Sequence, residues 1–264
     1  MDEKREQLIT EICLSLDEEE VIAQGLAARL AASGLPEEER AELEANAPRL
    51  LLYRRLVRGN LEAAARRLLP RTVACLEQNG SAAFAHEFAL FLAESCTRTH
   101  YLRDIGVELA RWGAPRWAAP GFPPYLTDLA RYEVLEFDVA IALPPEAPAA
   151  MDELALDRAV VFEPPARLAY FAHAVHEEDD PPAPRDAAVL VFRDAEHAIH
   201  AREIAPAVAP VLERLLAGES LANAVRGPAP AHESAAPMDD TLLARVAEVL
   251  AELAAERVLL GAAA

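Results

Sequence analysis

The first half of the chain has apolar side chains at helical spacing and very little proline. Only Pro36, Pro48 and Pro70 come before residue 114, whereas the other 17 of the 20 prolines follow it. Because proline breaks a helix interior, long helices are expected in the first half only. We predict a helical stretch over 2–33, a helix that starts at Pro36, and helices over 49–58, 61–78, 82–97, 101–112 and 125–141, with Gly59-Asn60 and 79–81 as breaks.

Beyond residue 153 the apolar period changes from 3.6 to 2, which is typical of β-strands. The alternation predicts strands over 159–163, 167–176, 188–193 and 197–204, the last two joined by a tight loop over 194–196. Helical spacing then returns and predicts helices over 206–217, 219–226 and 240–258, with a loop over 227–238.

The stretch 142–153 is rich in proline, alanine and acidic residues and has no period, so we expect a linker there. The fold class is therefore α+β. An all-helical N-terminal part, divided into an extension (1–47) and a domain (48–141), precedes a winged-helix-like domain (154–264), in which a small antiparallel sheet is joined to three helices.

Net charge argues against nucleic acid as a partner. The chain has 25 basic and 44 acidic residues, a net charge of −19, whereas affinity for nucleic acid comes largely from basic side chains that neutralise phosphates. A winged helix invites the alternative of a DNA-binding transcription regulator. However, 12 residues (227–238) separate its last two predicted helices instead of three or four. The last helix carries Glu248, Glu252 and Glu256, which phosphates would repel.

Cysteine usage and the N-terminus predict a cytoplasmic protein. The three cysteines, Cys13, Cys75 and Cys96, form no C-x-x-C pair and are odd in number, as expected of free thiols in a reducing compartment. The charged N-terminus has no apolar segment of a signal peptide. No apolar run approaches the roughly 20 residues that a membrane span needs.

The sequence offers no set of catalytic or metal-binding residues. Two H-x-x-H pairs, His173/His176 and His197/His200, fall in predicted strands, where positions i and i+3 point to opposite sides of the sheet. Motifs of serine hydrolases, zinc proteases and nucleotide-binding loops are absent. We therefore predict no catalytic residue, no metal and no cofactor in this chain.

One basic cluster stands out in this acidic sequence, and two interpretations of it stay open. It is either a docking face for an acidic partner or a set of internal partners for the acidic first helices. Its members are Arg49, Arg54, Arg55, Arg58, Arg66, Arg67 and Arg71.

From about residue 48 onward the chain resembles a known family. In the helical part the resemblance lies in Leu51-Leu-Tyr53, Asn60-Leu61, Leu69-Pro70-Arg-Thr72, Phe84, Phe88–Leu92, Tyr101–Asp104, Pro124–Arg131 and Glu133. In the tail it lies in the predicted hairpin 188–204, Leu212–Gly218, Ser220-Leu221 and the terminal helix. The family is the HvfC/BufC-like partner subunits of multinuclear non-haem iron-dependent oxidative enzymes, of the methanobactin and thiaglutamate pathway type. The tail is similar to the PqqD-like peptide-recognition fold.

The resemblance implies a non-catalytic accessory subunit. Such a chain binds the leader of a ribosomally made precursor peptide while a TIM-barrel-like oxidase, which holds the iron, modifies the core of the peptide. The partner would form a heterodimer with this chain through the helical domain. The expected docking residues are Tyr101, Arg103, Asp104, Tyr125, Asp128 and Arg131. A structural adaptor that binds the oxidase but no peptide is a further alternative.

The resemblance also implies a peptide site at the strand 197–204, which comes just before the three helices, where the resembled fold adds its guest strand. If it is an edge strand, an extended leader can pair with it by β-augmentation. The expected groove has His197, Ile199, Ala201 and Glu203 on the strand and Leu243, Val246 and Leu250 on the last helix. The alternative for these three helix residues is packing in the core of the domain.

Overall fold

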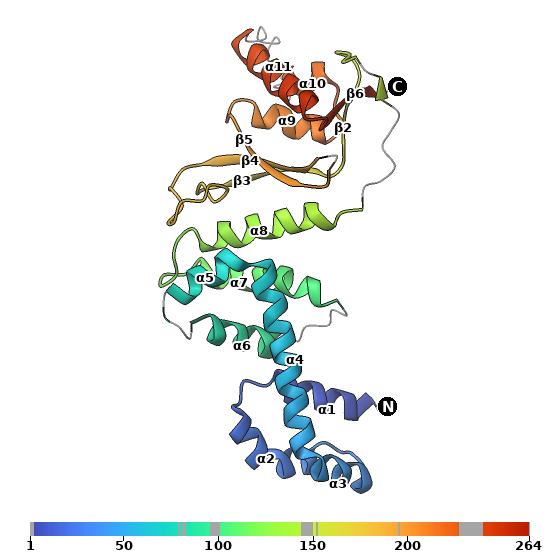
Figure 1. Cartoon of the computed structure of the whole chain (residues 1–264), viewed down its shortest axis with the longest axis vertical. Helices are drawn as coiled ribbons and strands as arrows, with labels where there is room; N and C mark the ends of the chain where they lie inside the picture. The colour runs from blue at the N-terminus through green and yellow to red at the C-terminus, as the bar shows by residue number, and fades with distance from the viewer. Residues whose placement is uncertain are drawn as a thin grey trace, which may run out of the picture. The chain divides into compact units, whose positions relative to one another are not determined.

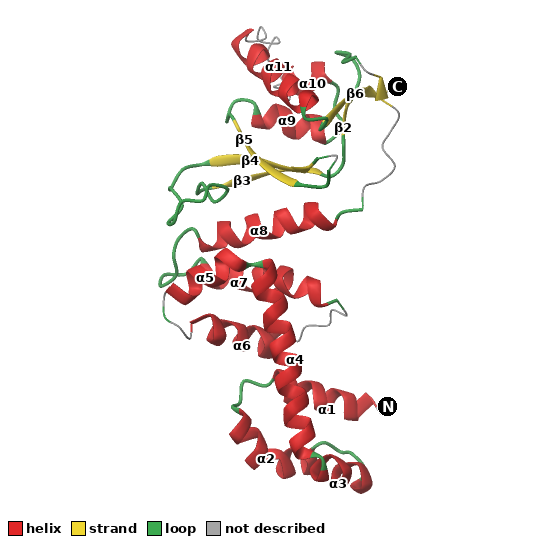
Figure 2. Ribbon diagram, in the orientation of Figure 1, coloured by secondary structure: helices red, strands yellow, loops and turns green. Residues whose placement is uncertain are grey.

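The computed structural model describes residues 3–78, 80, 83–95, 101–143, 150–151, 153–194, 196–226 and 240–263. Its internal contacts divide the chain into an N-terminal unit (1–130) and a C-terminal unit (131–264). The first is helical, and the second combines small antiparallel sheets with helices (Figures 1 and 2). The α+β fold class is therefore confirmed. In the described residues no helix is long and apolar enough to cross a membrane.

The division falls inside a helix, before the stretch that we predict to be a linker. Residues 144–149 and 152 of that stretch lie outside the described residues. The predicted domain boundaries accordingly stay predictions.

The helices of the first 141 residues follow the predicted order with shifted ends. They are α1 (Glu3–Leu14), α2 (Glu19–Ala32), α3 (Glu37–Ala45), α4 (Ala47–Leu68), α5 (Pro70–Gln78), α6 (Ala83–Ser95), the 3-10 turn η1 (Leu102–Asp104), α7 (Ile105–Trp117) and α8 (Leu126–Ile141).

The helical stretch 2–33 is broken, which its apolar spacing does not reveal. After α1 the backbone N–H of Asp17 donates to the Ser15 hydroxyl oxygen over 3.1 Å, and that hydroxyl donates to the Asp17 carboxylate. Such local side-chain bonds give the backbone an alternative to the helix. Conversely, the predicted break at Gly59-Asn60 is wrong, because α4 runs through it. The buried residues Leu61 and Ala65 beyond the glycine show that packing holds this part of α4 helical.

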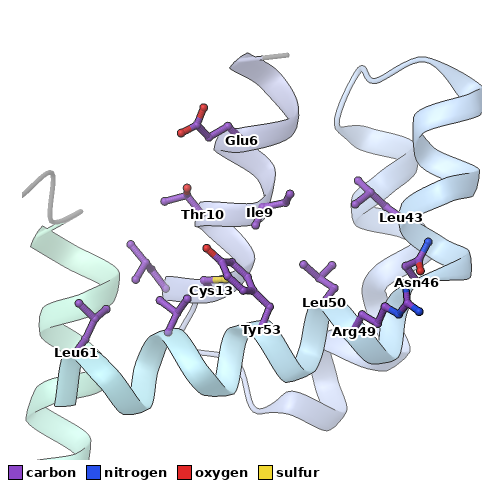
Figure 3. Close-up of a pocket in the computed structure, with 12 residues that line it drawn as sticks. Glu6, Ile9, Thr10, Cys13, Leu43, Asn46, Arg49, Leu50, Tyr53 and Leu61 are labelled. Carbon is purple, nitrogen blue, oxygen red and sulfur yellow. The ribbon is translucent and has the colours of Figure 1, made fainter. Parts of the chain in front are cut away.

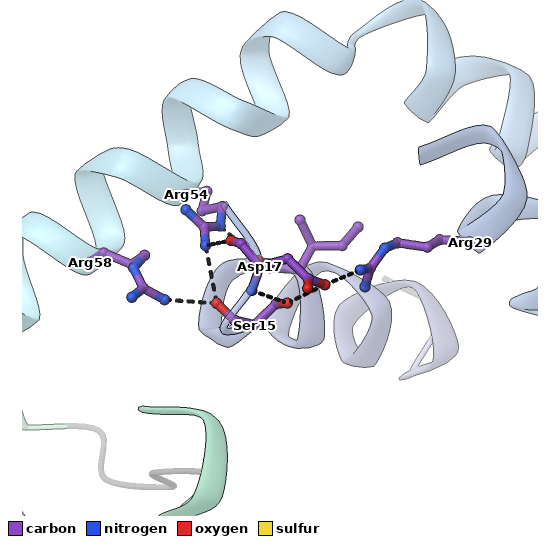
Figure 4. Close-up of polar contacts among 6 residues, drawn as sticks. Ser15, Asp17, Arg29, Arg54 and Arg58 are labelled. Atoms are coloured by element: carbon purple, nitrogen blue, oxygen red, sulfur yellow. Dashed lines mark hydrogen bonds and ion pairs between the residues drawn. The ribbon is translucent and has the colours of Figure 1, made fainter. Parts of the chain in front are cut away.

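Arg54 of α4 binds the C-terminal end of α1 and the turn that follows it. Its side chain is buried, and its guanidinium donates to the carbonyl oxygens of Ile12 (3.1 Å), Ser15 (3.0 Å) and Asp17 (2.7 Å). Arg58 donates to the Ser15 carbonyl as well (Figure 4). The last carbonyls of a helix have no partner within it, so these arginines supply what α1 lacks.

The basic cluster is thus used internally in part. Besides Arg54 and Arg58, Arg55 pairs with Glu19 of α2 over 3.2 Å, and Arg66 pairs with Glu62 and Glu77. The pairing with an acidic side chain of the first helices that the second interpretation expects is present at Arg55, whereas Arg54 and Arg58 bind backbone carbonyls and Arg66 pairs within α4 and with α5.

The C-terminal unit contains the sheets β1-β6-β2 and β3-β4-β5, both antiparallel. The strands are β1 (Ala150–Met151), β2 (Val160–Phe162), β3 (Ala166–Phe171), β4 (Ala187–Arg193), β5 (Ile199–Ile204) and β6 (Leu259–Ala263). The helices after β5 are α9 (Ala209–Leu216), α10 (Leu221–Arg226) and α11 (Asp240–Ala255). The predicted loop 227–238 lies outside the described residues.

Strand β4 is covered on both faces. Ala188, Leu190 and Phe192 join the core formed with α9–α11, whereas the alternate residues Val189 and Val191 are fully buried on the other face. There, residues 131–141 of α8 lie along the sheet (Figure 2). The Tyr132 ring meets Phe171 edge-on with 5.9 Å between centroids, and Arg193 donates to the Ala140 carbonyl.

Strand β6 is missing from the predicted elements. We expected a helix over 240–258, but α11 ends at Ala255, and Arg257 adopts a positive φ of 58° before the chain enters β6. The pairing of β6 with β2 around Val161 and Gly261 closes the unit.

We predict that Arg54→Ala lowers the free energy of unfolding of the α1 region by about 2–3 kcal/mol, because the carbonyls of Ile12 and Asp17 lose this donor and that of Ser15 keeps only Arg58. Amide hydrogen exchange of α1, measured alongside urea unfolding, gives this value. Arg55→Ala is the matched control. Its side chain is 61% exposed, so the loss should stay below about 1 kcal/mol. Equal losses in the two variants would contradict the assigned role of Arg54.

Candidate functional site

Strand β5 lies at the edge of the sheet β3-β4-β5. It pairs with β4 from Ala188↔Ile204 to Arg193↔Ile199, and among the described residues no strand pairs with its outer side. The N–H and C=O groups on such an edge are available to an added strand. Strand β3 is the other edge of this sheet, but it is β5 that is connected to α11 by side chains, as follows.

The face of β5 that meets the helices carries His200, Arg202 and Ile204. Ile204 is buried in the core with α9 and α11. Arg202 donates to Glu252 of α11 over 2.9 Å and also pairs with Glu256. The guanidinium therefore bridges the edge strand and the last helix.

Our expected groove placed the wrong face of the strand toward α11. Ile199, Ala201 and Glu203 alternate with the residues above and point to the opposite side of the sheet. His197 precedes the strand, which starts at Ile199, and has a positive φ of 66° in the turn after β4. The register of the pairing with β4 decides these faces, and the alternating pattern alone did not fix it.

Glu203 belongs to a charged cluster with the segment that follows β3. Arg185 donates to the carboxylates of both Glu203 and Glu177, and Nε2 of His176 lies 3.1 Å from the Glu203 carboxylate. The bond from Arg185 holds the pKa of Glu203 below its usual value. The ligand atoms of His176, Glu177 and Glu203 are close enough to share a cation. The Arg185 guanidinium already supplies a positive charge to both carboxylates.

His200, which lies outside this cluster, also has structural contacts. The Nε2 atom of His200 lies 2.6 Å from the Asp194 carboxylate, which lowers the pKa of Asp194, and the ring stacks on Phe192. His173 and His176 follow the end of β3 at Phe171, so the predicted strand 167–176 is too long.

The three predicted residues of the last helix do lie together, but they line a cavity that is not the expected groove beside β5. Leu243, Val246 and Leu250 line a cavity of about 540 Å³ in the C-terminal unit. Its other walls come from α10, β6 and the segment before β2, and among the described residues Arg226 is the only charged one in its lining. Val246 and Leu250 are also buried in the core, as the alternative interpretation expected. None of the predicted β5 residues lines this cavity.

The predicted docking residues divide between exposed and buried positions. Tyr101 is 61% exposed, and the Arg103 guanidinium lies over its ring and pairs with Asp104 over 3.2 Å. The Tyr125 hydroxyl accepts a bond from the Cys75 thiol. Asp128 is only 8% exposed.

Asp128 therefore does not fit a docking surface, which needs exposed residues, because this side of α8 packs inward. Arg131, the first residue of the C-terminal unit, is exposed and donates to the Tyr170 carbonyl. Whether the exposed members dock a partner stays a prediction.

A second cavity, of about 520 Å³, lies in the N-terminal unit between α1, α3 and α4 (Figure 3). Cys13 and Tyr53 face it from α1 and α4, with Glu6 and Arg49 at its margin. Burial raises the pKa of the Cys13 thiol, which keeps it protonated and unreactive. This cavity therefore offers an apolar surface and no nucleophile.

The comparisons with known proteins place the β5 edge and the adjoining helices in a family. Residues 164–254, or 91 of the 264, match the model of the HvfC C-terminal domain. This part of the chain is similar to the HvfC C-terminal domain. The matched region begins just before β3 and ends within the last turn of α11, so it includes the edge strand, Arg202 and most of the cavity lining. No curated protein matches the chain.

Sequence reasoning missed Arg202, Arg185 and Arg226. The charge pattern carried a partial signal for Arg202, because Glu252 and Glu256 lie four residues apart on one face of a helix and together invite a cation. No pattern in the sequence indicates which arginine supplies it.

We predict that Arg185→Met raises the pKa of Glu203 toward its ordinary value, because the main bond that stabilises the carboxylate is lost. A carbon-13 titration of the carboxyl group measures this. A lowered pKa stabilises the folded state above the unfolded-state pKa, and that stability is lost as pH falls. The stability difference between wild type and variant should therefore be largest near neutral pH and shrink on acidification.

Arg167→Met is the control for this titration. Arg167 lies on β3 and pairs with Asp138 over 3.8 Å, so its loss should leave the pKa of Glu203 unchanged. A pKa of Glu203 that does not move in Arg185→Met would show that Arg185 is not its main partner.

Proposed function

We propose that this chain is the accessory, peptide-recognising subunit of a multinuclear iron oxidase complex. It binds the leader of a ribosomally synthesised precursor peptide and presents the core to a TIM-barrel-like oxidase that holds the iron. The HvfC C-terminal domain supports a partner subunit of the HvfC/BufC type. The observation that carries the peptide role is the unpaired outer side of β5, next to α11, within that domain.

Main-chain pairing is the chemistry that such an edge offers. An extended leader adds as a strand beside β5, and its N–H and C=O groups fix the register without any contribution from the side chains. Side chains of β5 then discriminate among peptides. On the helix side these are His200 and Arg202, and on the other side Ala201 and Glu203.

The charges around the edge favour a peptide over a nucleic acid. Glu252 of α11 and Glu256 just after this helix already pair with Arg202, so the arginine nearest the edge is not free for phosphates. A peptide strand needs no such charge. We place the catalytic residues and the iron in the oxidase and none in this chain, which acts by holding its peptide in the cytoplasm.

We predict a heterodimer with the oxidase encoded beside this chain, formed through the helical part around Tyr101 and Arg103. Both side chains are exposed on one short segment. Light scattering coupled to size-exclusion chromatography at micromolar concentration should give the summed mass. Tyr101→Ala together with Arg103→Ala should weaken the complex at least tenfold, whereas Arg245→Gln on α11 should not. Separate elution of the wild-type proteins would rule out the subunit role.

We also predict that the precursor peptide protects every second amide of β5 from hydrogen exchange. Successive N–H groups of a strand point to alternate sides, and only those on the outer side gain a partner. Amide hydrogen exchange of the full chain, measured by NMR with and without the precursor, shows whether the protected amides of β5 alternate. Protection confined to the N-terminal unit would mean that the leader binds elsewhere on this chain.

A further inference from the structure

The cavity of the C-terminal unit is apolar almost throughout. Besides Leu243, Val246 and Leu250, its lining consists of Leu154, Leu156, Leu221, Ala222, Val225, Arg226, Ala247, Ala251, Ala254 and Leu259. At about 540 Å³ it lies within the range of pockets that hold ligands, about 300–1,000 Å³. Leu154 and Leu156 at its border are 44% and 68% exposed, so large apolar side chains there are open to solvent.

The one charged residue of the lining has no partner in the described part of the chain. Arg226 ends α10 and is exposed, and no described residue makes a hydrogen bond or ion pair with its guanidinium. Among the described residues Arg245 has no such bond either, but it does not line the cavity. Arg54, Arg66, Arg185 and Arg202, for example, are all bonded.

An apolar space beside a guanidinium that no described residue binds has a complementary ligand of definite chemistry. Apolar side chains fill the space, and a carboxylate next to them accepts the bonds that Arg226 can donate. Because the space is open to solvent and belongs largely to the HvfC C-terminal domain, a segment of a bound peptide can supply both.

We propose that this cavity is the anchor site of the precursor peptide and takes two neighbouring apolar side chains followed by a carboxylate that pairs with Arg226. The inference rests on the proposed function, since it assigns the chemistry of the peptide that the domain recognises. It goes beyond pairing at β5, because the cavity lies on a different side of α11. Residues 243, 247 and 251 follow one another at i+4 spacing on the cavity side, about half a turn away from Glu252 and Glu256.

The test uses the full chain and synthetic pentapeptides that differ in one residue. The probe is acetyl-Ala-Leu-Leu-Ala-Glu-amide, and its two counterparts have glutamine or lysine in place of glutamate. Amide shifts in NMR spectra of the labelled chain give both the affinity and the location. We expect the glutamate peptide to shift α10, α11 and β6, and to bind about tenfold more tightly than the glutamine peptide and more tightly still than the lysine peptide.

Two variants test the Arg226 guanidinium and the apolar space separately. Arg226→Gln should remove the preference for glutamate over glutamine. Ala251→Trp places an indole in the cavity from an exposed helix position and should abolish binding of all the peptides. Arg245→Gln is the matched control, because Arg245 is exposed on the same helix but does not line the cavity. This variant should bind all three peptides as the wild type does and should keep the preference for glutamate.

Equal affinities of the glutamate and glutamine peptides for the wild type would overturn the role of Arg226. Unchanged binding to the Ala251→Trp variant, or shifts confined to β5, would overturn the anchor site. The absence of binding by all three peptides would overturn it as well. None of these results contradicts the proposed function. That function fails separately, if the full precursor leaves the β5 amides unprotected and the oxidase does not associate with this chain.

Discussion

The burial of β4 on both faces is the constraint that organises the C-terminal unit. Its run of apolar residues cannot face water on either side, so the sheet needs two covers. Helices α9–α11 supply one, through Leu190 and Phe192, and residues 131–141 of α8 supply the other over Val189 and Val191. With both faces occupied, the strand edges are the part of this sheet that is left for a partner.

The same constraint gives β5 its two different sides. Its helix-facing residues have to fit against α11, and Arg202 does so by pairing with Glu252 and Glu256. The residues on the opposite face of β5 lie toward the segment after β3, where the Glu203 carboxylate accepts a hydrogen bond from Arg185. Charged groups on an edge strand also protect it from indiscriminate pairing with other chains. An edge that is charged and open at once is suited to a selected peptide rather than to aggregation.

The sequence predicts the type of each secondary-structure element better than the residues at which it begins and ends. Proline spacing and the change of period separate helices from strands correctly, because both depend on local sterics and on the faces that are buried. The continuity of α4 through Gly59 depends on tertiary packing, and the break after α1 depends on the distant Arg54 as well as on the local Ser15–Asp17 bonds. Apolar spacing contains neither. Strand β6 was missed for the same reason, since its partner β2 lies about 100 residues away in the sequence.

For the candidate site, the sequence indicates the right elements and the wrong faces. The strand 197–204 and the helix from 240 are both present, but register places Ala201 and Glu203 away from α11, and helix rotation places Leu243 beside α10. One residue of register exchanges the two faces of a strand, and one residue rotates a helix by about 100°. Neither is determined by hydrophobic spacing alone when both faces of a strand carry apolar residues.

The geometry of α11 then limits any peptide that uses both the β5 edge and the cavity. Glu252 and Glu256 face β5, and Leu243, Ala247 and Ala251 face the cavity, so the peptide has to pass around the helix. A helix with its side chains is about 10 Å across, and an extended chain spans about 3.3 Å per residue. At least about four residues must therefore separate the segment that pairs with β5 from the apolar pair and its carboxylate. A leader in which the two features lie closer together can occupy one of the sites but not both.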